Sequence, residues 1–325
     1  MKKIYLDYAA STPVAPEVAK AMAPYFGEHF GNPSSLHHFG QKTSGAVFGA
    51  RRSVAKALGA GPEDIIFTGS ATEANNLALR GLVKGLRFKV KNVGRPRIIT
   101  SAIEHESVLE TCRDLERDGV EVIYLPVDKN GFVDLKKFKA ALNDRTILVS
   151  VMHANNEVGT IQPIIEIAGI LRNFRNSKYE ILNSKQSQNI KSNNKSNKVS
   201  DLEFRISNLE AALPLLHTDA AQSFQYLDCR PAELGIDLMT LSAHKIYGPK
   251  GVGALYANKA AREVMRPVVA GSGQENGLRS GTENVPGVVG FGKAVEVAGK
   301  IREKEAARVL DLRDYFWKEL RTKLR

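Results

Sequence analysis

The chain has 325 residues, of which 43% are hydrophobic and 25% charged, a balance typical of a globular protein. It contains no apolar run of about 18 residues, so we expect no membrane span. Its N-terminal MKKIYLDYAASTP has no secretion signal, so we expect no export. Its two cysteines are too few for a disulfide framework and favour a reducing, cytoplasmic compartment. The net charge of +11 would suit nucleic acid, but no basic stripe interleaved with aromatic residues occurs, so we expect solvated charges and no direct nucleic-acid partner.

Short apolar runs alternate with helical patterns along the chain. DIIFT predicts a buried strand, GS a turn, and ATEANNLALRGL a helix whose apolar residues recur at helical spacing. RIITS, followed by EHESVLETCRDL, repeats the scheme. VEVIYLPV, TILVSVM, LLHTD and two runs on either side of SAHK supply further strands. This alternation predicts an α/β fold, a layered sheet with crossover connections.

Residues 173–208 interrupt this pattern. The segment is rich in Asn, Ser and Lys and poor in residues that pack, so it cannot bury enough apolar surface to offset its ordering entropy. We expect a mostly disordered surface insertion there, which a loop tolerates at small cost. Beyond it, GKAVEVAGKIREKEAARVLDLRDYFWKELRTKLR predicts one or two amphipathic helices, and the chain ends inside this pattern without a glycine or proline stop signal.

Polar side chains follow the predicted strands, where ligands of open α/β sheets bind. The turn TGSAT opens a helix whose first N–H groups attract anions, and Thr72 adds a hydroxyl, although a plain helix cap is the alternative. His105 follows the next strand and is either a ligand-facing or a structural histidine. Three later strands end in further polar groups, namely His153, Asn155, Asn156 and Glu157, then Asp219 and Gln222, then Ser242, His244 and Lys245.

These groups together are the parts that pyridoxal phosphate requires. Lys245 can form a Schiff base with the aldehyde, although a lysine is more often a solvated surface charge. A buried Asp219 needs a partner, and the protonated ring nitrogen of the cofactor would be one. The anion cradle would take the phosphate. No CxxC or HExxH spacing competes with this interpretation, and we expect no metal.

A series of motifs then indicates a family. YLDYAASTP, FGNPSS, FTGSATEANNLA, EHESVLETC, MHANNEVGTIQP, TDAAQS, SAHKIYGPKGVGALY and GSGQENGLRSGTENVPG occur in this order. Through them the chain resembles the cysteine desulfurases of the NifS/IscS type, class V members of the fold type I pyridoxal-phosphate enzymes, from Tyr5 to about Phe316 apart from the insertion. The resemblance implies a mixed, mostly parallel sheet in a large domain at 16–261, an N-terminal segment at 1–15 that joins a small domain, and the start of that small domain at 262–325.

The resemblance also implies a role for each candidate residue. Lys245 would be the Schiff-base lysine, Asp219 would pair with the ring nitrogen, and His105 would stack on the ring. The others would contact the rest of the cofactor: Gln222 and Asn156 at the phenolic oxygen, Asn156 also near the substrate carboxylate, and Ala71 and Thr72, with Ser242 and His244 beside them, at the phosphate. Thr282 would reach the phosphate of the partner subunit, so a homodimer is expected.

The implied reaction converts L-cysteine to L-alanine and passes the sulfur to an enzyme cysteine as a persulfide. Iron–sulfur cluster assembly or tRNA thiolation would use that sulfur, through a scaffold or another sulfur-acceptor protein. The catalytic cysteine loop of the family would begin beyond Arg325, so we expect a C-terminally truncated chain, with Cys112 structural and Cys229 on the surface. Another class V enzyme, such as an aminotransferase or a selenocysteine lyase, or a non-catalytic pseudoenzyme that binds the cofactor, is the alternative.

Overall fold

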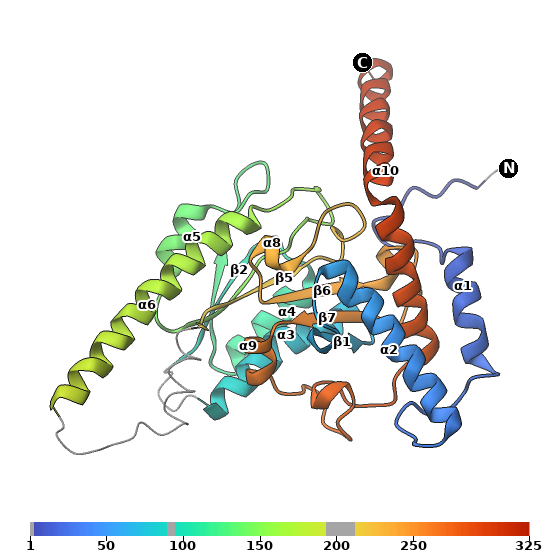
Figure 1. Ribbon diagram of the computed structural model, residues 1–325. Coiled ribbons are helices and arrows are strands. Elements are labelled where there is room, and N and C mark those ends of the chain that lie inside the picture. The colour runs from blue at the N-terminus through green and yellow to red at the C-terminus, as the bar shows by residue number, and fades with distance from the viewer. Residues whose placement is uncertain (1–2, 90–94, 193–211, 325) are drawn as a thin grey trace.

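The computed structural model describes residues 3–89, 95–192 and 212–324, and it shows one seven-stranded sheet between two layers of helices (Figure 1). The strand order is β1-β7-β6-β5-β4-β2-β3. The strands are β1 Ile65–Thr68, β2 Arg97–Ser101, β3 Glu121–Leu125, β4 Thr146–Ser150, β5 Leu215–Asp219, β6 Leu238–Ser242 and β7 Gly253–Ala257. Within the described residues, β7 runs antiparallel to β1 and β6, and the other neighbours are parallel. The expected mixed, mostly parallel α/β sheet is confirmed.

Helices cover both faces of the sheet because parallel strands need crossover connections and are buried on both sides. One apolar cluster joins the sheet to α3 Ala71–Lys89, α4 Glu106–Arg117 and α9 Lys259–Val264. The other joins the opposite face to α2 His38–Leu58, α5 Leu135–Ala141, α6 Ile164–Ser192, α8 Pro231–Leu234 and α10 Val285–Lys323, with α1 Pro16–Met22 packed alongside. β4, β5 and β6 are buried along their whole length.

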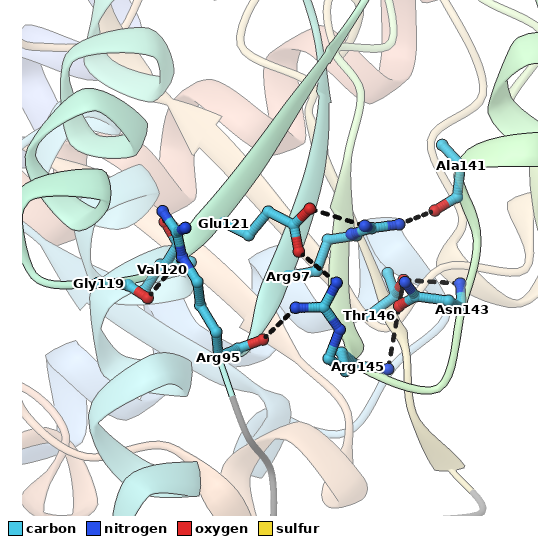
Figure 2. Close-up of polar contacts among 9 residues, drawn as sticks. All are labelled: Arg95, Arg97, Gly119, Val120, Glu121, Ala141, Asn143, Arg145 and Thr146. Atoms are coloured by element: carbon cyan, nitrogen blue, oxygen red, sulfur yellow. Dashed lines mark hydrogen bonds and ion pairs between the residues drawn. The ribbon is translucent and has the colours of Figure 1, made fainter.

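A cluster of arginines around one carboxylate holds the starts of β2, β3 and β4 together (Figure 2). Glu121 forms ion pairs with Arg97 at 2.7 Å and with Arg145 at 2.8 Å. Arg97 also donates to the carbonyl of Ala141 at 2.7 Å, which ties α5 to the same edge. The hydrogen bond from Arg97 and the neighbouring guanidinium charges hold the pKa of the Glu121 carboxyl below its usual range. The amino ends of these strands are thereby fixed, and the polar residues of the site follow the carboxyl ends.

Helix α6 extends further than the sequence indicated. It runs to Ser192, so residues 173–192, expected to be disordered, are helical. Its first turns bury Ile167 and Leu171, and Arg175 pairs with Asp237 at 2.6 Å, which gives a nucleus from which a helix propagates into polar sequence. Residues 193–208 of the expected insertion lie outside the described residues, and their disorder stays a prediction.

The C-terminal pattern forms one long helix rather than two. The first part of α10 packs against α2 and α1, whereas its C-terminal part stands clear of the other elements (Figure 1). The expected domain boundary between 261 and 262 falls inside α9, so the division into a large and a small domain stays a prediction. Among the described helices, none combines the length and the apolar character that crossing a membrane requires.

Candidate active site

A cavity of about 440 Å³ lies where β2, β4, β5 and β6 end, and its size is typical of small-molecule sites. Nine of the ten predicted site residues line it: Ala71, Thr72, His105, Asn156, Asp219, Gln222, Ser242, His244 and Lys245. Thr282 does not; it is exposed in the loop before α10. The parallel strands therefore gather nine side chains from five separate parts of the sequence at one edge.

Lys245 lines this cavity just beyond the end of β6. β6 ends at Ser242, and a single turn of 3-10 helix, Ala243–Lys245, carries the lysine past the strand end. Its Nζ donates to the carbonyl oxygens of Ala9 and, at 2.9 Å, Ala10. Partial burial lowers the pKa of the amine, against the opposing charge of Asp219. A lowered pKa increases the uncharged fraction, which is the nucleophilic form.

Asp219 lies at the end of β5 and is only 6% exposed. Its Oδ2 accepts from Asn75 Nδ2 at 2.8 Å, and its Oδ1 accepts from the N–H of Ala221 at 2.9 Å. Burial raises the pKa of the carboxyl, while these hydrogen bonds and the charge of Lys245 act in the opposite direction. The result is a buried acceptor with one strong side-chain partner, suited to a cationic ring nitrogen.

Asn75 is a site residue that the sequence analysis missed. It is fully buried on α3, and its Nδ2 also donates to Ser107 Oγ at 2.8 Å. The available signal was a polar residue on the apolar face of the helix ATEANNLALRGL, because a buried amide there needs partners. Asn75 fixes the orientation of the Asp219 carboxylate.

The turn before α3 forms an anion cradle. The N–H of Glu73 donates to Ser70 Oγ at 3.1 Å, and the first N–H groups of a helix have no partner within it. Gly253 of β7 lies directly behind this turn, since a Cβ there would stand 2.7 Å from the carbonyl carbon of Ser70 and 2.8 Å from the nitrogen of Ala71. Ser242 Oγ is buried in the cavity wall and has no hydrogen-bond partner among the described residues. A phosphate group supplies the oxygens that these donors lack, so the residues fit pyridoxal phosphate.

His105 has a structural role and a place in the cavity at once. It caps the N-terminus of α4, where its Nδ1 accepts from the N–H of Ser107 at 3.1 Å and lies 2.8 Å from the hydroxyl of the same serine. The ring also lines the cavity, so capping and a ring-facing role do not exclude each other. Its position over the cofactor ring stays a prediction.

The N-terminal segment closes one side of the cavity, which the sequence analysis did not anticipate. Gln222 Nε2 donates to the carbonyl of Ala9 at 3.0 Å. Thr12 bonds the carbonyl of His244 through both its N–H and its hydroxyl, at 3.0 Å each, and accepts from the N–H of Tyr247 at 2.8 Å. Residues 9–12 are therefore attached to the loop that carries the lysine.

The residues after β4 divide between the turn and the cavity. Asn155 is buried, and its Oδ1 accepts from the N–H groups of Glu157 and Val158 at 2.9 Å, so it serves the turn. Asn156 lines the cavity, and its Nδ2 donates to Glu157 Oε1 at 2.6 Å. Of the four polar residues of this motif, Asn156 and Glu157 line the cavity, as do its apolar residues Met152 and Ala154.

Neither cysteine lies in the cavity. Cys112 is fully buried in α4, and burial raises the pKa of its thiol to about 12. Cys229 was expected on the surface, and this expectation is wrong: it is 1% exposed, because the chain after Gln222 turns back into the core. Its Sγ lies 3.6 Å from His153 Nδ1, and burial raises its pKa to about 11. In the described parts of the chain, no group of three or more His, Cys, Asp or Glu is placed to bind a metal.

This geometry agrees with comparisons to known proteins. The class-V aminotransferase family matches residues 4–179 and 188–322. The chain belongs to this family. The gap in the match, 180–187, falls inside the segment interpreted above as an insertion. Within the family, the chain is 44% identical to the cysteine desulfurase IscS of Dictyoglomus turgidum over 323 residues, which cover 99% of this chain and 71% of that one. The corresponding enzyme of Rickettsia prowazekii is 41% identical, with 99% and 68% covered.

Solved structures of the family extend this likeness to three dimensions. A NifS-like protein superposes with a TM-score of 0.80 at 35% identity, covering 99% of this chain and 76% of that one. A structure described as SspA in complex with cysteine has a TM-score of 0.74 at 38% identity, covering 90% and 72%. The resemblance to NifS/IscS-type cysteine desulfurases is confirmed, and with it the fold type I architecture and the dependence on pyridoxal phosphate.

Proposed function

We propose that this protein is a pyridoxal-phosphate-dependent cysteine desulfurase that acts on L-cysteine. The observation that carries the proposal is the convergence of the Lys245 amine, the buried Asp219 carboxylate and the anion cradle of α3 on one cavity. The relatives named as cysteine desulfurases, and the related structure described with cysteine, support the choice of substrate.

The residues divide the chemical work between them. Pyridoxal phosphate, when bound, supplies a ring that accepts electrons from the α-carbon of the amino acid. Asp219 would hold a proton on the ring nitrogen, which strengthens that acceptor. The first turn of α3, with Thr72 and Ser242, would bind the phosphate. Lys245 would hold the cofactor through its aldehyde, and its Nζ would be the group that accepts the α-proton of the substrate, because its lowered pKa favours the uncharged amine.

The sulfur acceptor of this reaction is a thiol other than Cys112 and Cys229. Attack on the substrate sulfur requires a thiolate within reach of the cavity. Both thiols are buried away from it, and both have pKa values raised well above neutrality. Loss of either cysteine is therefore expected to leave the chemistry at Lys245 unchanged.

We further propose a homodimer in the cytoplasm that delivers sulfur to an iron–sulfur scaffold or another acceptor protein. The exposed position of Thr282, outside its own cavity, supports a role toward a second subunit. The burial of both cysteines as free thiols supports a reducing compartment. Sedimentation of the chain with and without Thr282→Ala, at matched cofactor occupancy, tests the shared site.

The decisive experiment uses Lys245→Ala beside Lys250→Ala, a change of an exposed lysine five residues away. With pyridoxal phosphate, the parent and Lys250→Ala should show a visible absorption band and a borohydride-reducible adduct, and Lys245→Ala should show neither. Addition of L-cysteine should perturb the band. An adduct that survives in Lys245→Ala refutes the lysine assignment, and amino-group transfer to a keto acid without sulfide release would point to an aminotransferase instead.

A further inference from the structure

An ion pair lies directly behind the anion cradle. Glu73, in the first turn of α3, accepts from the N–H of Gly69 at 2.7 Å through Oε2. Its Oε1 accepts from Arg279 Nε at 2.9 Å. Arg279 belongs to the loop before α10, far from Glu73 in the sequence. The carboxylate thus bridges this distant loop to the turn that receives the phosphate.

The loop that carries Arg279 is itself firmly anchored. Arg51 of α2 forms a two-pronged pair with Glu275, both distances being 2.7 Å, and the Glu275 side chain is only 1% exposed. Glu275 also accepts from the N–H of Phe67 in β1 at 3.0 Å. Glu275 and Asn276 have φ values of 51° and 58°, which non-glycine residues rarely adopt, so the anchoring contacts hold a strained turn in place.

The negative charge of Glu73 would repel a phosphate bound at the cradle, and the positive charge of Arg279 offsets this repulsion. A carboxylate in the first turn of a helix whose N-terminus binds phosphate repels that phosphate across about one helical turn. A guanidinium paired with the carboxylate cancels this repulsion without occupying the phosphate position. Arg279 does not line the cavity, which distinguishes it from a direct ligand.

We propose that Arg279 is a positioning residue for cofactor recognition: it neutralises Glu73 and fixes the cradle turn, and so sets the preference of the site for a phosphorylated ligand. The inference rests on the proposed function, since it assumes that the cradle binds the phosphate of pyridoxal phosphate. Because Arg279 shortly precedes Thr282 in the sequence, the same anchored loop would support the phosphate of one subunit from behind and present Thr282 to the other.

The test compares pyridoxal phosphate with pyridoxal, which lacks the phosphate, by absorbance titration of the whole chain. Arg279→Gln leaves Glu73 uncompensated, so we expect affinity for pyridoxal phosphate to fall about 5- to 10-fold while affinity for pyridoxal changes less than about 2-fold. Glu73→Gln leaves Arg279 unpaired, and the ratio of the two affinities should shift in the opposite direction. The double variant should lie between the two single variants.

A matched control separates this role from general stability. Arg262 pairs with Asp64 at 2.7 Å with a similar exposure, 24% against 26% for Arg279, and it does not line the cavity. Arg262→Gln should leave both affinities unchanged. Equal losses for both ligands in Arg279→Gln, or no loss, overturn the inference. If Arg279→Gln does not unfold cooperatively, Glu73→Gln decides instead. An unchanged ratio of the affinities for pyridoxal phosphate and pyridoxal in Glu73→Gln then overturns the inference. Failure of the parent to bind either ligand would count against the proposed function.

Discussion

Replacing Glu275 by glutamine should destabilise the fold more than the loss of any exposed ion pair. The carboxylate is 1% exposed and accepts both guanidinium nitrogens of Arg51 together with the N–H of Phe67. Glutamine keeps the shape, but it offers an N–H group where one acceptor stood and leaves the Arg51 charge, 14% exposed, without a counter-ion. Breaking a buried ion pair costs about 3–5 kcal/mol. Because Arg51 keeps some contact with water, we expect the lower end of this range, about 3 kcal/mol.

Thermal unfolding followed by far-ultraviolet circular dichroism measures the effect. In a chain of this size about 3 kcal/mol corresponds to a fall in Tm of roughly 6 °C. The control is Asp64→Asn, which removes the carboxylate paired with Arg262; Asp64 is 18% exposed against 1% for Glu275, so its loss should cost about 1 kcal/mol, or roughly 2 °C. If Asp64→Asn lowers Tm as much as Glu275→Gln does, then burial of the pair does not set its contribution and the reasoning is wrong.

Three further expectations concern the core and the cavity. Burial raises the pKa of the Glu104 carboxyl from 4.5 to about 8, so the folded state binds this proton more tightly than the unfolded chain; the associated stability is present below pH 4.5 and is lost as pH rises through about 8. Urea midpoints measured between pH 4.5 and 8 should fall with rising pH in the parent and should lack that decline in Glu104→Gln. The same dependence of the midpoint on pH in both proteins would contradict the raised pKa of Glu104. Gly253→Ala should weaken cofactor binding and lower the free energy of unfolding by about 1–3 kcal/mol, because the new Cβ must displace the turn at Ser70. An unchanged cofactor titration and an unchanged Tm would show that this turn moves without cost. Cys112 and Cys229 should react with a thiol reagent only as fast as the protein unfolds, and rapid labelling of the native chain would mean that one of them is accessible.

Much of the site could be predicted from sequence because it depends on local rules. Strands such as RIITS and LLHTD are short, apolar and bounded, and the carboxyl ends of parallel strands meet at one edge of a sheet, so the strand pattern alone places Asp219 and Lys245 together. Roles within the cofactor site came from motifs of the family. The geometry brings nine of the ten residues, all but Thr282, to one cavity, and their individual contacts with the cofactor stay predictions.

What the sequence could not provide were pairings between distant segments. The sequence around Asn75 does not indicate that Asp219 is its hydrogen-bond partner. The sequence around Lys245 does not indicate that its amine donates to the carbonyls of Ala9 and Ala10. The burial of Cys229 depends on how the chain after β5 returns to the core. The extension of α6 through polar residues depends on a well-packed start, which composition alone does not reveal.

The outward part of α10 also determines what the intrinsic fluorescence of this protein can report. Trp317 is the only tryptophan of the chain, and it is 58% exposed on that part of the helix. Its emission should be that of an indole in water, and it should respond to whatever covers or unwinds the end of α10. It lies outside both apolar clusters and the cavity, so a blue shift of its emission would mark an event at the helix end rather than a change in the core or at the cofactor site.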